Sequence, residues 1–131
     1  CSLSWIRYKQ VPDLWEKLCE ASYTHGVNQF KLDMLADPPK EYMQYTIYEK
    51  GEYYHWHFDL YGTRKLTGLI LLNKDFKGGE HQQCLSNTPT TINLDPGDLF
   101  LFPSYIVHRC APVTKGRRLA LATFFHGPRL Q

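Results

Sequence analysis

The chain has 131 residues, of which 43% are hydrophobic, 21% charged and 15% aromatic. This composition is typical of one soluble globular domain, and it excludes a disordered tail, a collagen-like repeat and a coiled coil. Lys and Arg number 15 against 13 Asp and Glu, which gives a net charge of +2. A balance this even provides no electrostatic basis for nucleic acid or an anionic membrane as the main partner.

The chain contains no apolar run near the roughly 18 residues that a membrane span needs, and it does not open on a secretory signal pattern. We therefore expect a cytoplasmic protein that is not embedded in a membrane. The chain begins with Cys1 rather than Met, so a leader segment that has been removed remains an alternative. The four cysteines are scattered and form no C-x-x-C pair, so we expect free thiols rather than a disulfide or a cysteine zinc site.

The first 40 residues read differently from the rest of the chain. Apolar residues recur there at helical spacing, at Val11, Leu14, Trp15, Leu18 and Cys19. This spacing predicts a helix over residues 13–24, with Asp13 and Glu16 as a capping box and Gly26 as its C-terminal stop. Residues 31–40, which include Asp-Pro-Pro, read as a connection.

From about residue 41 onward, short apolar segments alternate with turn signals. The predicted strands cover residues 42–48, 53–60, 66–72, 78–85, 90–93, 99–102, 106–111 and 118–125. This pattern predicts a mainly β fold, a double-stranded β-helix (jelly-roll) barrel with one N-terminal helix packed outside. We expect residues 1–131 to form a single domain, with a lead-in over about 1–40 and the barrel over about 41–126.

One dense polar segment lies on a predicted strand, His55-Trp56-His57-Phe58-Asp59. Strict alternation places His55, His57 and Asp59 on one face. An H-x-D pair can grip a metal ion, and His108 on a distant strand could supply a third ligand. Two histidines and one carboxylate form the facial triad of non-haem Fe(II) oxygenases. We expect His55 to line the barrel mouth, with a place among the ligands as the alternative.

The last predicted strand carries a buried cation. Alternation puts Arg118, Ala120, Ala122 and Phe124 on one face, which describes a pocket with a guanidinium at its floor. A buried arginine is costly in free energy unless it pairs with an anion. The two parallel N–H groups of the Arg118 guanidinium suit a carboxylate. An intramolecular salt bridge with one of the 13 acids is the alternative. The remaining histidines, His25, His81 and His126, are expected to be ordinary surface or core residues.

Four segments carry a family resemblance. They are Y-x-x-G-x-x-Y-x-x-H-x-D at 48–59, L-N followed by F-x-G-G-E at 72–80, G-D-x-x-x-F-P-S followed by His108 at 97–108, and P-V-x-x-G-x-R at 112–118. In this order they resemble the Fe(II)- and 2-oxoglutarate-dependent dioxygenases, and within them the prolyl 4-hydroxylase-like branch. The resemblance covers roughly residues 42–126. Leu71, Ala120 and Phe124 depart from it, since relatives often carry Tyr, Ser and Trp there.

The resemblance implies a role for each matching residue. His57, Asp59 and His108 would bind the catalytic Fe(II), and Arg118 would pair with the C5 carboxylate of the cosubstrate 2-oxoglutarate. Tyr48 and Thr67 would line the cosubstrate pocket, whereas Tyr54 and Phe124 would lie on the substrate side. Strict alternation places Tyr54 opposite His57 unless a bulge intervenes. O2 is the implied oxidant, with ascorbate as an accessory reductant.

The implied reaction is hydroxylation of an unactivated C–H bond, with release of succinate and CO2. A peptidyl proline is the favoured substrate, and a free amino acid or other small molecule is the alternative. Two other classes stay open: a zinc hydrolase that uses the same ligands, and a non-catalytic β-barrel binding module. Demethylation of nucleic-acid bases is disfavoured by the absence of a basic run. The pattern does not predict an oligomeric state.

Overall fold

The computed structural model describes residues 1–32, 34 and 42–128. The described part contains one α-helix, one short 3₁₀ helix and a series of mostly short strands. In chain order the elements are β1 (Ser2–Ile6), η1 (Tyr8–Gln10), α1 (Pro12–Asn28), β2 (Met43–Tyr48), β3 (Tyr54–His57), β4 (Arg64–Leu71), β5 (Lys77–Gly78), β6 (His81–Gln83), β7 (Thr90–Ile92), β8 (Leu99–Pro103), β9 (His108–Cys110), β10 (Val113–Lys115) and β11 (Arg118–His126).

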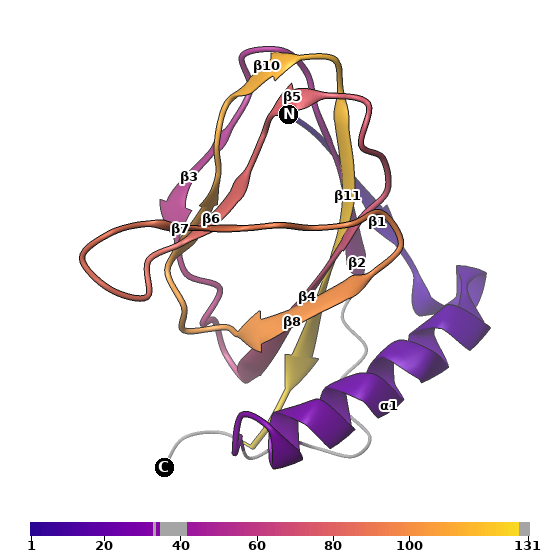
Figure 1. Ribbon diagram of the computed structural model, residues 1–131. Helices are drawn as coiled ribbons and strands as arrows, with labels where there is room; N and C mark the ends of the chain where they lie inside the picture. Colours follow the sequence, from indigo (N-terminus) through magenta and orange to yellow (C-terminus); the bar gives the residue numbers. More distant parts are fainter. Residues whose placement is uncertain (33, 35–41, 129–131) are drawn as a thin grey trace.

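Two antiparallel sheets make up the barrel. The larger has the strand order β1-β2-β11-β4-β8, and the smaller has the order β3-β9-β6-β7. A further two-stranded pair, β10-β5, closes one end. Figure 1 shows the two sheets as opposing walls, with α1 packed outside the larger sheet. The predicted jelly-roll barrel with one external helix is confirmed.

The long strand β11 separates the interior of the barrel from the core beneath the helix. Its register pairs Arg118 with Tyr48 of β2 and Phe124 with Thr67 of β4. These side chains face the smaller sheet, whereas Phe125 turns toward α1 and stacks on Trp15 with ring centroids 6.1 Å apart. The main core therefore lies between α1 and the larger sheet, and its fully buried members include Met43 and Leu66.

The helix differs from its prediction at both ends. The predicted capping box at Asp13 is wrong, because Val11 is the N-cap and makes no side-chain cap hydrogen bond. Gly26 does not end the helix, which continues to Asn28. A Cβ at Gly26 would lie 2.8 Å from Cγ of Met34. The glycine is therefore required by close packing and not by a turn.

The strand predictions were incomplete. β1 was not predicted, although Leu3 and Trp5 alternate with serines. The predicted strand at 78–85 is split between β5 and β6, and β10 is an additional short strand. Most of the connection predicted at 31–40 lies outside the described residues. All four cysteines are free, as predicted.

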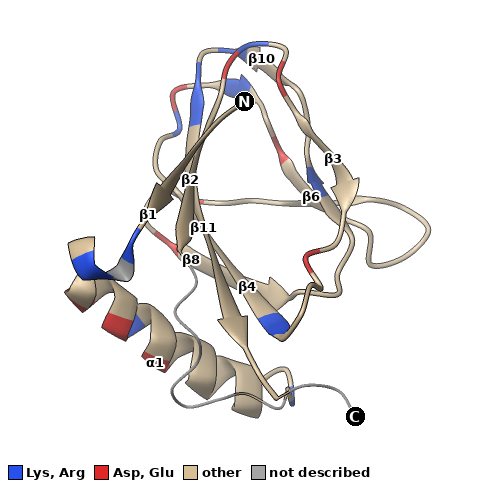
Figure 2. Cartoon of the chain, turned by 180° about the vertical axis from the view of Figure 1, so that it is seen from behind, with Lys and Arg blue, Asp and Glu red and all other residues tan. Residues whose placement is uncertain are grey.

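Charged residues of both signs are scattered over the chain. Figure 2 shows them along α1 and around the turns near β10, without a continuous stretch of one sign. Within the described part, no helix is long and apolar enough to cross a membrane. The expected absence of nucleic-acid and membrane partners stays a prediction.

The packing of α1 on the sheet yields a stability prediction. Phe125 is fully buried, so Phe125→Ala should lower the free energy of unfolding by about 3–5 kcal/mol through lost burial and a residual cavity. Leu85 is 58% exposed, and Leu85→Ala should change the free energy of unfolding by less than about 0.5 kcal/mol. Urea unfolding followed by circular dichroism measures both. Equal losses in the two variants would contradict this account of the core.

Candidate metal centre and anion pocket

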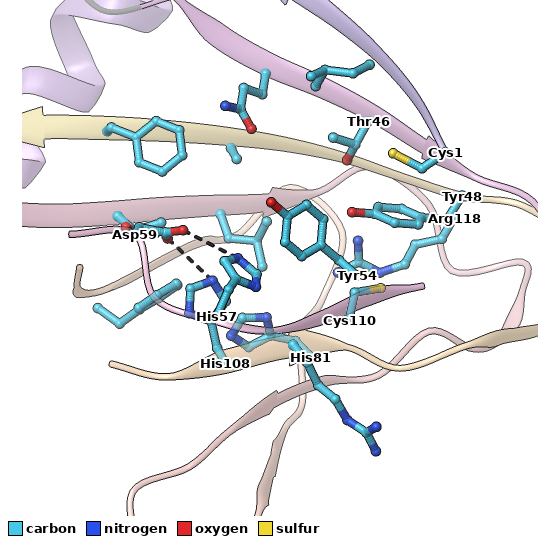
Figure 3. A pocket seen from close by; sticks show the side chains of 18 of the residues that line it. Cys1, Thr46, Tyr48, Tyr54, His57, Asp59, His81, His108, Cys110 and Arg118 are labelled. Atoms are coloured by element: carbon cyan, nitrogen blue, oxygen red, sulfur yellow. Dashed lines mark hydrogen bonds and ion pairs between the residues drawn. The ribbon is translucent and has the colours of Figure 1, made fainter. Parts of the chain in front are cut away.

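Three predicted ligands converge in space. His57 ends β3, Asp59 follows two residues later, and His108 begins β9. Nε2 of His57 lies 3.4 Å from Oδ1 of Asp59, and Nε2 of His108 lies 3.3 Å from Oδ2 of the same carboxylate. All the ligand atoms lie within 4.8 Å of one another. This is the spacing that three groups adopt around one cation, and Figure 3 shows them grouped together.

The backbone orients both imidazoles. Nδ1 of His57 lies 2.7 Å from the carbonyl oxygen of His55, and Nδ1 of His108 lies 2.9 Å from that of Ile106. A carbonyl only accepts hydrogen bonds, so each Nδ1 carries the proton and donates it. The lone pair of each ring is therefore on Nε2, the atom that faces Asp59. Hydrogen bonds of this kind set the tautomer that a metal-binding histidine needs.

A buried network holds the carboxylate of Asp59. The hydroxyl of Thr67 donates to Oδ2 of Asp59 at 2.9 Å and also lies 3.0 Å from the hydroxyl of Ser104. The backbone N–H of Asp59 donates to the carbonyl of Ser104 at 2.9 Å. Thr67 lines the cavity, yet its hydroxyl serves Asp59, and its predicted role toward the cosubstrate stays a prediction. Ser104 was not singled out, although the F-P-S motif contains it.

The pKa values favour a site ready for a cation. Burial alone would raise the pKa of Asp59, but the adjacent His57 and His108 imidazoles and the hydrogen bond from Thr67 outweigh it, so the pKa lies below its usual value. Burial lowers the pKa of His108, against the opposing effect of Asp59. Asp59 is thus held as the carboxylate and His108 as the neutral ring. Both are the forms that bind metal.

A cavity of about 290 Å³ connects the triad to the inner end of β11. It is lined by groups from both sheets, including Tyr48, Tyr54, Arg118 and Phe124. Figure 3 shows Tyr48, Tyr54, Cys110 and Arg118 together on one side of the triad. The cavity therefore has a candidate metal centre at one end and a cation at the other.

Arg118 is the unsatisfied charge of this cavity. It is 3% exposed, and its buried Nε has no hydrogen-bond partner. Among the described residues no carboxylate pairs with it, so the intramolecular salt bridge weighed from the sequence is not found there. A buried guanidinium without an anion is unstable, and one supplied by a ligand would satisfy it.

Tyr48 adds a neutral donor beside this guanidinium. The two residues are register partners in β2 and β11, and Cζ of Arg118 lies 5.8 Å from the Tyr48 ring centroid. Burial is the main cause that raises the pKa of Tyr48 to about 12. The phenol therefore keeps its proton at neutral pH and can donate a hydrogen bond to an anion held by Arg118.

Both residues predicted on the substrate side, Tyr54 and Phe124, line the cavity, and only Tyr54 is exposed. A register irregularity in the β3–β9 pairing brings Tyr54 to the His57 side, with ring centroids 4.1 Å apart, instead of the opposite face that strict alternation gives. Tyr54 is 49% exposed, whereas Phe124 is buried. Arg64, which the sequence did not single out, places its guanidinium 3.7 Å from the Phe124 ring centroid.

The same irregularity removes His55 from the site. His55 is exposed, and its ring lies 6.5 Å from that of Tyr53. It does not line the cavity that contains the triad, so the prediction that it shares a face with His57 is wrong. The strand is too short and irregular for a two-residue period to hold across it.

His81 is a buried polar residue beside the triad. It is 5% exposed, its ring centroid lies 5.5 Å from that of His108, and its Nε2 lies 3.2 Å from Nε2 of Gln83. Burial, followed by the nearby His108 and Arg118, lowers its pKa to about 3. The sequence prediction of a surface or core residue holds, since His81 is in the core.

The model of the 2OG-Fe(II) oxygenase superfamily matches residues 43–126, well over half of the chain. The chain belongs to the 2OG-Fe(II) oxygenase superfamily. Within it, the chain is 39% identical over 92 residues to a PKHD-type hydroxylase of Idiomarina loihiensis and 32% identical over 113 residues to one of a Psychrobacter species. These matches cover 63% and 76% of this chain, but only 42% and 44% of the relatives. The chain thus spans less than half the length of these curated relatives.

Solved structures of this superfamily share the fold. A Pseudomonas putida prolyl-4-hydroxylase superposes with a TM-score of 0.77 at 18% identity, covering 97% of this chain and 72% of the other. A viral collagen prolyl hydroxylase from Paramecium Bursaria Chlorella virus-1 gives a TM-score of 0.74 at 16% identity, covering 98% and 80%. At these identities the likeness establishes the jelly-roll fold alone.

The superfamily implies Fe(II) and 2-oxoglutarate, and the residues of this chain fit both groups. Two imidazoles and a carboxylate are a suitable donor set for Fe(II). The unpartnered buried Nε of Arg118 fits a ligand that brings its own carboxylate. The geometry thus suits a metal and a dicarboxylate in one cavity.

The support of Asp59 by Thr67 can be tested through metal affinity. Thr67→Val keeps the shape but removes the hydroxyl bonded to Asp59, so we expect affinity for Fe(II) or Mn(II) to fall about 10- to 100-fold. Thr123→Val is the matched control, because the buried Thr123 hydroxyl has no partner within the described part of the chain. Calorimetric titration measures both. Unchanged affinity in Thr67→Val would contradict the assigned support.

The buried His81 predicts a pH dependence of stability in the metal-free protein. An unfolded His81 has its ordinary pKa near 6.5, whereas the folded value is about 3, so between these values only the unfolded chain binds the proton. This contribution to stability is present above pH ~6.5 and is lost as pH falls, by up to about 1.4 kcal/mol per pH unit. His81→Phe should show a flatter profile in denaturant unfolding. Parallel profiles for the two proteins would contradict a neutral buried His81.

Proposed function

We propose that this chain hydroxylates an unactivated C–H bond, with a peptidyl proline as the favoured target, in a reaction that converts 2-oxoglutarate to succinate and CO2. The observation that carries the proposal is the buried Arg118 guanidinium in the same cavity as the His57, Asp59 and His108 side chains. Among the described residues no carboxylate pairs with it, and its Nε has no hydrogen-bond partner there. A metal centre alone would also serve hydrolysis. The buried guanidinium of Arg118 provides a second binding group besides the metal, which favours a cosubstrate that can bind to both.

Each part of the cavity has a task in this reaction. When bound, Fe(II) with 2-oxoglutarate and O2 supplies the oxidative chemistry that inserts one oxygen atom into the substrate C–H bond. His57, Asp59 and His108 would hold the metal from one side and would leave room for further ligands. Arg118 and the protonated Tyr48 would orient the cosubstrate through its distal carboxylate. The buried walls around Phe124 exclude water from the reacting atoms.

The mouth of the cavity favours an apolar ring as the target. Exposed Leu3, Trp5 and Tyr54 line its open side, and the buried Phe124 lies deeper. A pyrrolidine ring within a peptide matches such a wall, because it carries no charge and little polar surface. The names of the similar PKHD-type hydroxylases and of the P. putida prolyl-4-hydroxylase also support this choice.

A free amino acid is the second candidate, and Arg64 favours it. This guanidinium lines the same cavity against Phe124 and could bind the carboxylate of a small substrate.

A cytoplasmic location and ascorbate as a reductant that sustains turnover stay predictions.

The direct test is an assay with Fe(II), 2-oxoglutarate, ascorbate and a panel of proline-containing peptides and free amino acids. We expect a mass gain of one oxygen atom on a peptide, with succinate formed in equal amount. Hydroxylation of free amino acids alone would favour the second candidate. Zinc in the purified protein without consumption of 2-oxoglutarate would favour a hydrolase, and binding of neither metal nor 2-oxoglutarate would favour a binding module.

The role of Arg118 predicts a specific kinetic change. Arg118→Ala should raise the KM for 2-oxoglutarate by at least about 30-fold, because it removes the charged partner of the distal carboxylate, while metal affinity stays within about threefold. Arg117→Ala is a matched control, since Arg117 is 59% exposed and pairs with Glu49 outside the cavity. Succinate formation at varied 2-oxoglutarate measures both. An unchanged KM in Arg118→Ala would refute the assignment.

A further inference from the structure

Large apolar side chains are exposed on three connections beside the triad, the loops β3–β4, β8–β9 and β6–β7. Figure 1 shows these connections on the side of the barrel where β3 ends. Their exposed fractions lie between 37% and 78%. An exposed apolar cluster on a folded protein often marks a binding surface. We call this set the apolar rim patch, and its members are Phe58, Leu60, Tyr61, Leu85, Tyr105 and Val107.

Backbone hydrogen bonds tie the three connections of the apolar rim patch to one another. The N–H of Asp59 donates to the carbonyl of Ser104 at 2.9 Å, and the N–H of Cys84 donates to the carbonyl of Val107 at 2.8 Å. Two of the three triad residues belong to the same segments, because Asp59 lies between Phe58 and Leu60 and His108 follows Val107. The patch and the candidate metal centre are therefore built on one framework.

The apolar rim patch also adjoins the cavity that holds the triad. Phe124 lines that cavity, and Cζ of Arg64 lies 3.7 Å from the Phe124 ring centroid and 5.9 Å from the Tyr61 ring centroid. Tyr61 is therefore close to the cavity wall on its outer side. An extended peptide advances about 3.3 Å per residue, so a peptide with its target residue at the triad would reach the patch within a few residues.

Charge and size indicate what the apolar rim patch binds. Residues 58–61, 84–88 and 104–107 include one charged side chain, that of Asp59, which is only 10% exposed and belongs to the triad. Six large side chains at about half exposure present on the order of 500 Å². A stable dimer buries about 800 Å² on each partner. The patch thus suits a short, uncharged peptide segment better than a second copy of the chain.

We propose that the apolar rim patch is the docking surface for the segment of a peptide substrate that lies on one side of the target residue, and that it selects substrates with apolar residues there. The inference rests on the proposed function, because it assumes that the target residue binds at the triad. Burial of apolar side chains against the patch supplies the affinity, and the absence of exposed charge disfavours charged flanking residues.

The first test compares three peptides, each with one central proline. One carries three leucines before the proline, one carries three leucines after it, and in the third all flanking residues are serine. Calorimetric titration of the full chain loaded with Mn(II) and 2-oxoglutarate measures their affinities. One leucine peptide should bind at least about tenfold more tightly than the serine peptide, because burial of a leucine side chain favours binding. Affinities of all three within about threefold would overturn the inference.

A substitution in the patch locates the binding surface. Tyr105 is 57% exposed, and Tyr105→Ala should weaken the preferred leucine peptide by at least about fivefold while the serine peptide changes by less than about twofold. Tyr23→Ala is the matched control, because Tyr23 is 41% exposed on α1, outside the larger sheet. If Tyr105→Ala does not fold by circular dichroism, Leu85→Ala tests the same patch. Equal effects on the two peptides, or an equal effect of Tyr23→Ala, would overturn the inference.

The other possible occupants of the patch give different results. A dimer in sedimentation velocity that Tyr105→Ala dissociates would show that a second copy covers the patch, and it would overturn the inference. If none of the three peptides binds, the inference is also overturned. The mass-gain assay with free amino acids then decides separately whether the chain is a hydroxylase, so the two failures are distinguishable.

Discussion

The carboxylate of Asp59 lies between two imidazole nitrogens at 3.3 and 3.4 Å in a half-buried setting, and the rest of the site depends on this arrangement. Both rings turn their lone pairs toward it, because backbone carbonyls accept the Nδ1 protons of His57 and His108. A carboxylate and two lone pairs that converge in this way are satisfied by a cation. Cross-strand pairing of His57 with His108 and the Thr67–Ser104 network hold the two imidazoles and the carboxylate in place without a bound cation.

The guanidinium of Arg118 supplies the complementary constraint. A candidate metal centre at one end of the cavity and a buried guanidinium at the other, which pairs with no carboxylate among the described residues, would suit a ligand that is anionic at both ends. The protonated Tyr48 fits the same ligand, because a phenol that retains its proton donates to a carboxylate and does not repel it. The mouth, with exposed Tyr54, leaves room for a second molecule beside the metal. The proposed cosubstrate and substrate sites thus share one cavity.

Sequence reasoning succeeded where the chain is regular. β11 is a long uninterrupted strand, so alternation correctly placed Arg118 and Phe124 on the inner face. Strict alternation failed for His55, because the irregular β3–β9 pairing exchanges the faces that a two-residue period assigns. The same irregularity is the exception that the sequence analysis allowed for Tyr54, which lines the cavity. The support of Asp59 by Thr67 depends on tertiary contacts that no local pattern encodes. The prediction that Gly26 ends the helix was wrong for the same reason, because Gly26 is needed for its close contact with Met34.

The central claim is that the triad and Arg118 hold one molecule of 2-oxoglutarate between them through a bound metal. Thermodynamic linkage tests it directly, by calorimetric measurement of 2-oxoglutarate affinity with and without Mn(II), and of Mn(II) affinity with and without 2-oxoglutarate. The account predicts that each strengthens the other by the same factor, because both contribute to one complex. Equal 2-oxoglutarate affinity in the presence and absence of metal would contradict it.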